Sequence, residues 1–241
     1  MGLLSVIVPT YNERENIRPL CQALAAAVPD FELIFVDDAS PDGTAAEVEA
    51  VAAADPRVKL VHREAKLGLG SAVLRGLEHS QGEIVVMMDA DLSHSPTDLP
   101  RMVAALEAAD VAVGSRYVKG GRIVGWPRRR RWMSYGALLL AHRLLALPVR
   151  DATSGFAVFR RPALEGVKGK LSPRGFKLLL EVMVRAPQLR VKEVPITFTD
   201  RAWGRSKMGL GEVMAFITLL WELRAEQRLM QDAGRPPRHY I

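Results

Sequence analysis

Residues 83–97 read EIVVMMDADLSHSPT, and this stretch decides the fold assignment. Residues 83–89 form an apolar run of strand length, Asp89-Ala90-Asp91 ends it, and Ser93-His94-Ser95-Pro96 opens a helix. A run that is apolar on both faces is typical of a strand covered on both sides by helices. The two aspartates are therefore expected at the carboxyl end of a buried strand, where open α/β sheets bind their ligands.

The same pattern recurs through the first 115 residues. Similar apolar runs occupy residues 3–9, 31–37, 57–62 and 110–115. Stretches with helical character lie between the runs, at residues 13–27, 44–54, 69–80 and 97–108. Alternating strands and helices predict an α/β fold of the Rossmann-like, doubly wound type, with a mainly parallel sheet and helices on both faces.

After residue 115 this alternation breaks. A Gly-rich connection (119–125) leads to a helical, largely apolar stretch at 132–147, and further short strands are expected at 151–160 and 191–198. The tail from 211 to 230 is predicted to be an amphipathic helix. Its expected apolar face comprises Val213, Phe216, Ile217, Leu220 and Trp221.

Composition excludes several classes of protein. The chain has 241 residues, of which 49% are hydrophobic and 25% charged, and these values exclude disordered and low-complexity chains. The single cysteine, Cys21, excludes an internal disulfide framework and fits a reducing compartment. No apolar run approaches the ~20 residues that span a bilayer, and no basic n-region of a signal peptide is evident.

The net charge of +6 hides a strong asymmetry along the chain. Residues 1–115 carry 8 basic and 18 acidic side chains, a net charge of −10, whereas residues 116–150 carry nine basic side chains and no acidic one. Residues 151–241 carry 16 basic and 9 acidic side chains. An acidic half suits a metal or nucleotide, and a basic half suits phosphates or an anionic surface.

The Asp89/Asp91 pair is a candidate metal site. Side chains two apart in an extended segment point the same way, and two carboxylates at a ligand edge favour a hard cation such as Mg²⁺ or Mn²⁺. His94 is a candidate second-layer group beside the pair. The alternative is a solvated turn in which one aspartate caps the next helix.

Two other strand ends favour a nucleotide. Asp37 and Asp38 are adjacent and face opposite ways, so at most one is expected to reach a ligand. Tyr11 could stack on a base and Glu13 could accept N–H donors, although the same residues also suit a simple helix start. Residues 66–71 contain neither a Walker motif nor G-x-G-x-x-G, which argues against an NTPase or dehydrogenase phosphate loop.

Taken together, the motifs resemble a known family. In order and spacing, residues 3–210 are similar to inverting family-2 glycosyltransferases of GT-A fold, and the second half resembles dolichyl- or polyprenyl-phosphate mannose synthases. The segments that carry this resemblance are Pro9-Thr-Tyr-Asn-Glu13, Val36-Asp-Asp-Ala-Ser-Pro-Asp-Gly-Thr44, Asp89-Ala-Asp91, Gly114-Ser-Arg-Tyr117, Asp151-Ala-Thr-Ser-Gly-Phe156, Gly175-Phe-Lys177, Glu193-Val-Pro-Ile-Thr-Phe198 and Asp200-Arg-Ala-Trp-Gly-Arg-Ser-Lys207.

The resemblance implies roles for individual residues on the donor side. It assigns guanosine binding to Pro9, Tyr11, Glu13, Val36 and Asp38. It assigns the metal and diphosphate to Asp89, Ala90 and Asp91, with Arg201 and Lys207 as further phosphate ligands. Some relatives have a glutamine ligand to the metal where this chain has Ser93, a weaker ligand.

On the acceptor side, the resemblance points to Arg116 and to the arginine run at 128–131. Relatives have a basic residue four before a Ser-x-Gly-Ala, here Ser134-Tyr-Gly-Ala137, which favours Arg130 for the acceptor phosphate with Arg131 beside it. Asp151 is expected to orient one of these groups. A plain arginine run is more often a solvated face or a patch for nucleic acid or anionic lipid, and the helix after it suits a membrane interface or a buried core equally.

The resulting hypothesis is inverting transfer of mannose from GDP-mannose to dolichyl or polyprenyl monophosphate, with Mg²⁺ or Mn²⁺ as cofactor. We expect one catalytic domain (1–210) with a nucleotide and metal half (1–115) and an acceptor half (116–210), followed by the helix and tail (211–241). The enzyme is expected in the cytoplasm, held peripherally at the membrane by itself or by an anchoring subunit. The alternatives are a UDP-glucose-dependent polyprenyl-phosphate glucosyltransferase and a basic nucleic-acid-binding protein. The second is disfavoured because basic residues adjoin apolar helices instead of interleaved aromatics.

Overall fold

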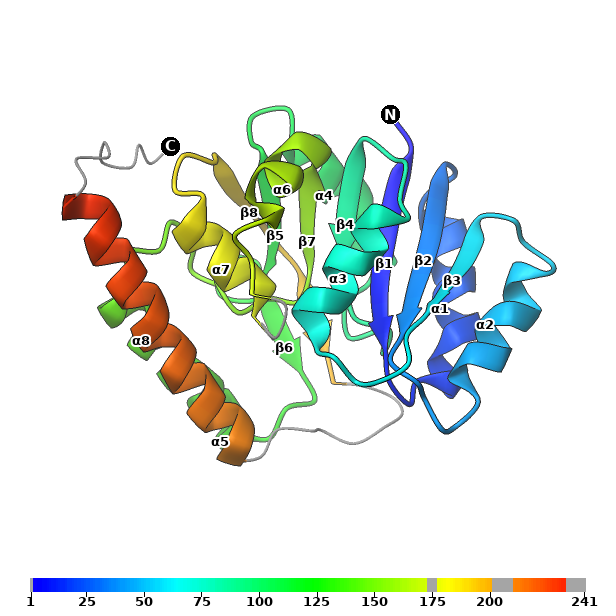
Figure 1. Cartoon of the computed structure of the whole chain (residues 1–241), viewed down its shortest axis with the longest axis horizontal. Coiled ribbons are helices and arrows are strands. Elements are labelled where there is room, and N and C mark those ends of the chain that lie inside the picture. The colour runs from blue at the N-terminus through cyan, green and yellow to red at the C-terminus, as the bar shows by residue number, and fades with distance from the viewer. Residues whose placement is uncertain (1, 173–176, 201–209, 233–241) are drawn as a thin grey trace.

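A computed structural model of the chain contains a central seven-stranded sheet in the order β3-β2-β1-β4-β7-β5-β8 (Figure 1). The structure describes residues 2–172, 177–200 and 210–232. The strands are β1 (Leu4–Thr10), β2 (Phe31–Asp37), β3 (Val58–His62), β4 (Ile84–Met87), β5 (Val111–Ser115), β7 (Ala157–Arg160) and β8 (Val191–Pro195). All pairings are parallel except those of β7, which runs antiparallel to β4 and β5. The mainly parallel α/β fold expected from the sequence is confirmed.

Helices cover both faces of this sheet. They are α1 (Arg14–Ala27), α2 (Thr44–Ala52), α3 (Leu69–Glu78), the 3₁₀ turn η1 (Pro96–Asp98), α4 (Leu99–Ala105), α5 (Arg128–Leu144), α6 (Arg161–Lys168), α7 (Leu178–Arg185) and α8 (Leu210–Asp232). One hydrophobic core lies between the sheet and α3, α6 and α7, and a second core lies between the sheet and α1, α2 and α4. Helices α5 and α8 lie side by side at one end of the molecule (Figure 1).

The alternation of side chains along the strands explains the two cores. In β1, Val6 and Val8 enter one core and Ile7 enters the other, and all three are fully buried. Successive residues of a strand point to opposite faces, so a strand with helices on both sides must be apolar throughout. Each fully buried aliphatic side chain contributes about 1.5–3 kcal/mol.

Two features of the second half differ from expectation. Strand β7 is reversed within an otherwise parallel sheet, and the Gly-rich connection at 119–125 contains a strand, β6 (Arg122–Val124), that pairs with β9 (Thr197–Thr199) in a small parallel sheet. Pairing with residues more than forty positions away determines both features, and no local pattern of hydrophobicity reveals such pairing.

The buried face of α8 was also predicted wrongly in part. Phe216, Leu219, Leu220 and Leu223 are buried, but Val213 and Trp221 are exposed by 37% and 59%. Among the described residues, the helix packs mainly against α5 and α7, so a narrow stripe is covered and several of its other apolar side chains are exposed. Within the described ranges, no helix is both long enough and apolar enough to cross a bilayer.

Gly76 on α3 allows the helix to approach the sheet closely. A Cβ atom at this position would lie 2.4 Å from Cγ2 of Ile7. We expect Gly76→Ala to lower the free energy of unfolding by about 1–3 kcal/mol through overpacking, measured by urea denaturation. The control is Gly166→Ala in α6, where nothing lies within 4 Å of the new methyl group and a gain of up to about 1 kcal/mol is expected. Equal stability of the two variants would contradict this account.

Candidate active site

Most of the candidate residues gather at one edge of the sheet. Strands β1, β2, β4 and β5 end at this edge, and the reversed strand β7 begins there, at the lower edge of the sheet in Figure 1. The edge therefore brings together Tyr11, Glu13, Asp38, Asp89, Asp91, Arg116 and Asp151. Parallel strands deliver their carboxyl ends to one side, which is why residues far apart in sequence meet here.

The Asp89/Asp91 pair has one buried and one open carboxylate. Asp91 is 6% exposed and its Oδ1 accepts the amide of Ser93 at 3.0 Å, whereas the Asp89 side chain is 41% exposed. Ala90 between them is buried in the core, which separates it from the two carboxylates. Leu92 has φ of 57°, a left-handed conformation that costs a non-glycine residue about 1–3 kcal/mol and turns the chain sharply after the pair.

These oxygens fit a hard divalent cation. Across the residues described, no group of three or more His, Cys, Asp or Glu side chains could hold a metal ion. A cation here would therefore take two carboxylates, Asp89 and Asp91, and complete its shell from Ser93, water or a bound phosphate. Ser93 is buried directly beside Asp91, as a weak third ligand requires, and its role stays a prediction.

His94 lies beneath the pair in an aromatic setting. Its ring stacks on Phe156 and meets Phe198 edge-on, with centroids 5.2 Å away in both cases, and its Nδ1 is 3.8 Å from Oδ2 of Asp89. Burial lowers the pKa of His94 to about 4, against the attraction of the Asp91 charge. The ring is therefore neutral near pH 7 and adds no positive charge to this part of the site.

The adjacent acids at the end of β2 have different partners, as expected from their opposite directions. Asp37 is fully buried and accepts hydrogen bonds from Thr10 and Ser40, so it shapes the turn. Asp38 pairs with the buried guanidinium of Arg63, which also bonds the carbonyl of Gly68. Arg63 therefore positions the carboxylate that the resemblance assigns to guanosine binding, and no sequence motif indicated this role of Arg63.

The remaining residues predicted to bind the donor differ in which of their atoms a ligand could contact. Val36 is fully buried in the core and can offer a ligand only its backbone, and Pro9 lies beside it in the β1–β2 ladder. The Tyr11 ring carries the Lys66 ammonium 4.5 Å from its centroid, and the Glu13 carboxylate accepts a hydrogen bond from Asn16. Arg201 and Lys207 lie outside the described residues.

An ion pair between Arg116 and Asp151 joins the site through several hydrogen bonds. Nε and Nη2 of Arg116 donate to the two carboxylate oxygens at 2.7 Å, and the Arg116 amide adds a third bond at 3.0 Å. Burial lowers the pKa of Arg116, but the hydrogen bonds and charge of Asp151 outweigh this effect and hold the pKa above its ordinary value. Glu193 of β8 in turn accepts the amides of Arg150 and Asp151. Asp151, expected to orient one of the acceptor-side groups, contacts Arg116 in this way, and its functional role stays a prediction.

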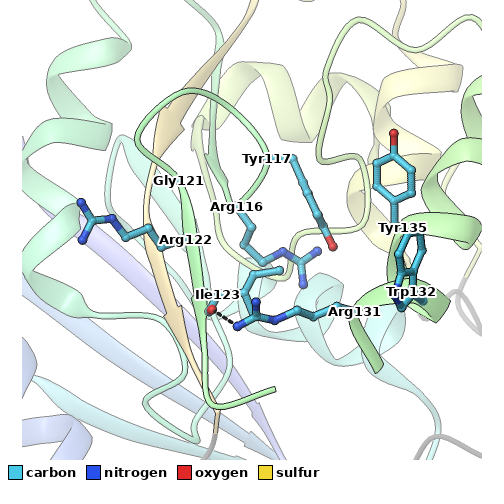
Figure 2. A pocket seen from close by; sticks show the side chains of 8 residues that line it. All are labelled: Arg116, Tyr117, Gly121, Arg122, Ile123, Arg131, Trp132 and Tyr135. Carbon is cyan, nitrogen blue, oxygen red and sulfur yellow. Dashed lines mark hydrogen bonds between the residues drawn. The ribbon is translucent and has the colours of Figure 1, made fainter. Parts of the chain in front are cut away.

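An open cavity of about 290 Å³ lies beside this pair, between β6 and α5 (Figure 2). Arg116, Tyr117 and Arg131 lie between the two elements, with Trp132 and Tyr135 on the helix side, while Arg122 points away from them in Figure 2. Arg131 donates to the carbonyl of Ile123 at 2.7 Å. Cations and aromatic rings thus line one space.

Arg130 and Ser134 do not line this cavity, but each is linked to a residue that does. Arg130 lies over the Trp126 ring at 4.2 Å and bonds Asp200 at 2.7 Å, and the guanidinium of Arg116 lies 5.6 Å from the same ring. Ser134 accepts a hydrogen bond from Tyr117, which lines the cavity. The structure therefore brings Arg116, Arg130 and Ser134 into one neighbourhood.

The arrangement has counterparts among known proteins. The sequence model of glycosyl transferase family 2 matches residues 5–167. The chain belongs to this family. The matched range contains both the Asp89/Asp91 pair and the Arg116–Asp151 pair, so this family-2 glycosyltransferase has its main polar groups within the shared region.

Three curated relatives are similar over most of the chain. The dolichol-phosphate mannosyltransferase of Pyrococcus furiosus is 39% identical over 227 residues, which are 91% of this chain and 63% of that protein. The undecaprenyl-phosphate mannosyltransferase of Micrococcus luteus is 39% identical, covering 91% of this chain and 93% of that protein. The polyprenol monophosphomannose synthase of Mycolicibacterium smegmatis is 42% identical, covering 84% and 80%. The chain thus spans less than two thirds of the Pyrococcus relative.

A solved structure shares the fold. A mannosyltransferase from Pyrobaculum calidifontis, solved in complex with GDP-Man and Mn²⁺, superposes with a TM-score of 0.66 over 98% of this chain and 66% of that chain, at 22% identity. At this identity, the similarity supports the GT-A architecture of the family-2 glycosyltransferase and no finer statement.

Lys177 is a site residue whose role the sequence did not indicate. It belongs to a segment that contributed to the resemblance, but no function was assigned to it. Burial lowers the pKa of Lys177, and the nearby charge of Arg116 adds to this effect, while Asp89 and Asp151 oppose it. The ammonium group therefore lies close enough to both the acidic and the basic parts of the site to interact electrostatically with each.

Gly155 offers a test of the Asp89 position. A Cβ atom at residue 155 would lie 2.9 Å from Oδ2 of Asp89, so Gly155→Ala must displace that carboxylate. Because of this overpacking, we expect Mn²⁺-dependent binding of GDP, measured by calorimetry, to weaken about tenfold. A tenfold rise in the dissociation constant corresponds to a loss of about 1.4 kcal/mol in binding free energy. Gly169→Ala, which meets nothing within 4 Å, serves as the control. Unchanged binding in Gly155→Ala would show that Asp89 does not contact the metal–nucleotide complex.

Proposed function

We propose that this glycosyltransferase transfers mannose from GDP-mannose to a dolichyl or polyprenyl monophosphate, with inversion at the anomeric carbon. The observation that carries the proposal is that Arg116 links two sites of opposite charge. Asp89 acts electrostatically on Arg116, and Arg116, which Asp151 holds in place, also lines the cationic, aromatic cavity beside α5. The names of the curated relatives support the same reaction.

The donor side of the site is suited to a nucleotide diphosphate. Tyr11, Glu13 and Asp38 lie along the edge next to the aspartate pair and offer an aromatic face and acceptors for base N–H groups. Asp89 and Asp91 would hold a divalent cation, which would supply positive charge for the departing diphosphate. The Mn²⁺ and GDP-Man of the Pyrobaculum structure fit this assignment.

The acceptor side is suited to a phosphate monoester. Four consecutive arginines begin α5, where the positive end of the helix dipole already disfavours cations, so a bound anion would relieve this repulsion. Arg116 and Arg130 share the Trp126 ring, and Arg131 and Ser134 lie close to them. These groups can bind phosphate oxygens by charge-assisted hydrogen bonds.

The chemistry follows from the charge of the acceptor. A phosphate monoester has a second pKa near 6, so it is largely dianionic at neutral pH and attacks without a strong general base. A phosphate oxygen forms the new bond to C1 of mannose as the bond from C1 to the diphosphate oxygen breaks, and GDP leaves with that electron pair. Arg116 lies where it can stabilise charge on either phosphate group.

The first test is a transfer assay with radiolabelled GDP-mannose, polyprenyl phosphate and Mg²⁺ or Mn²⁺, scored for lipid-extractable label. We expect product with the natural chain and a loss of at least about a hundredfold in Asp91→Ala, because a main metal ligand is lost, with the thermal unfolding transition retained. GDP should compete with the donor and UDP should not. Competition by UDP instead would favour the UDP-glucose alternative, and full activity of Asp91→Ala would reject the metal assignment.

We further propose that α5 and α8 place the enzyme on the membrane surface. Large apolar side chains on both helices are exposed, namely Trp132, Met133, Tyr135, Leu139, Leu140, Met214, Trp221 and Leu229. The exposed Arg128 and Arg129 begin the same helix. Exposed aromatic and basic residues together are suited to the interface of an anionic bilayer, next to the cavity that would take the lipid phosphate.

A double variant tests this surface. We expect Trp132→Ser with Tyr135→Ser to reduce cosedimentation with vesicles containing anionic phospholipid about tenfold, since two interfacial aromatic side chains are lost. Leu3→Ser with Leu67→Ser, two exposed apolar residues elsewhere, is the matched control. Unaltered vesicle binding of the double variant would reject the surface, and stronger retention of the chain by RNA than by vesicles would favour the nucleic-acid alternative.

A further inference from the structure

Arg130, proposed above to bind the acceptor phosphate, already holds an anion from its own chain. Its Nη1 donates to Oδ1 of Asp200 at 2.7 Å while the guanidinium rests on Trp126. The two side chains are 24% and 33% exposed, so solvent and a ligand can reach the pair. Asp200 was part of a segment that contributed to the resemblance, but it received no function there.

The backbone around Asp200 fixes where this carboxylate lies. The Asp200 amide donates to the carbonyl of Val124 at 2.9 Å, which extends the β6–β9 sheet by one bond. Gly125, with φ of 85°, approaches so closely that a Cβ there would lie 3.0 Å from Cβ of Asp200. Thr199, one residue earlier, donates to the carbonyl of Ser93. Backbone hydrogen bonds therefore fix the position of Asp200 beside Arg130. They also connect this segment to the loop that follows Asp89 and Asp91.

A carboxylate and a phosphate use the same donors of a guanidinium group. Both accept short, charge-assisted hydrogen bonds, so an acceptor phosphate at Arg130 must displace Asp200 or bind beside its negative charge. Either course weakens phosphate binding. In return, the carboxylate neutralises one cation of the arginine run, where helix dipole and neighbouring arginines make an unpaired charge costly.

We infer that Asp200 is an intramolecular competitor for the acceptor phosphate at Arg130. It lowers the affinity of the site for the lipid phosphate, and it reoccupies the guanidinium when the glycosylated product leaves. This inference rests on the proposed function, because it takes Arg130 as an acceptor-phosphate ligand.

A purely structural role for Asp200 predicts the opposite outcome. If Asp200 only held Arg130 in position, its removal would release the arginine and weaken phosphate binding. Asparagine keeps the shape and one hydrogen-bond acceptor, whereas alanine removes both, so the two substitutions separate competition from positioning.

The experiment is calorimetric titration of the full chain with geranyl phosphate, a soluble isoprenyl monophosphate, in the presence of Mg²⁺ and GDP. We expect the dissociation constant to fall about fivefold in both Asp200→Asn and Asp200→Ala, the scale of a partly exposed ion pair. The control is Asp110→Asn, which removes one charge and a comparable pair with Arg190 at the start of β5, and it should leave binding unchanged. Thermal unfolding of each variant checks that it is folded.

The outcomes separate this inference from the function on which it rests. Unchanged or weaker binding in both Asp200 variants, with weaker binding in Arg130→Ala, overturns the competitor role and leaves the acceptor site standing. Equal binding by the natural chain and Arg130→Ala, or none by either, overturns the acceptor assignment itself. A gain in Asp200→Asn that is lost in Asp200→Ala assigns Asp200 a positioning role instead.

Discussion

The buried ion pair between Arg116 and Asp151 joins the parts of the site. Arg116 follows β5 directly and Asp151 precedes β7, so two residues 35 apart in sequence link the ends of two strands that are neighbours in the sheet. Removing one member of a buried pair leaves an unpaired charge and typically costs 3–5 kcal/mol. Glu193 of β8 holds the backbone of Asp151, so three strands contribute to the placement of one guanidinium group.

This arrangement explains how opposite charges coexist at one edge. The acidic residues come from the ends of β2 and β4, and the basic residues come from the end of β5 and from α5. Two buried charges at the site have a partner of opposite sign: Asp38 pairs with Arg63, and Arg116 pairs with Asp151. Pairing of this kind keeps the groups ionised and oriented although they are removed from water.

Much of the first half could be predicted from the sequence because its information is local. Apolar runs of strand length identified β1 to β5, and the position of Asp89 and Asp91 directly after one run placed them at the ligand edge. The separate directions of Asp37 and Asp38 followed from the pleat alone. These features depend on a residue and its immediate neighbours.

The second half could be predicted less well because its features depend on distant contacts. Contacts between segments distant in sequence determine the reversal of β7, the pairing of β6 with β9 and the exposure of Trp221 on α8. Hydrophobic periodicity does not show which distant segments will pack together. Arg63, Lys177 and Asp200 were missed for the same reason, since a single charged residue acquires a role only through its partner. The division into a catalytic domain and a separate tail stays a prediction.

The reversed strand β7 also has a consequence for how such an enzyme can diversify. In a wholly parallel sheet, the chain that leads into a strand lies at the edge remote from ligands. Because β7 runs backwards, residues 151–156 lead into it from the ligand edge, between the ends of β4 and β5. The ligand edge thereby gains a connecting segment that is not part of any parallel strand–helix–strand unit. Changes in the length or sequence of this connection can therefore reshape the ligand edge, where Gly155 lies against Asp89, without rebuilding any of the parallel strand–helix units.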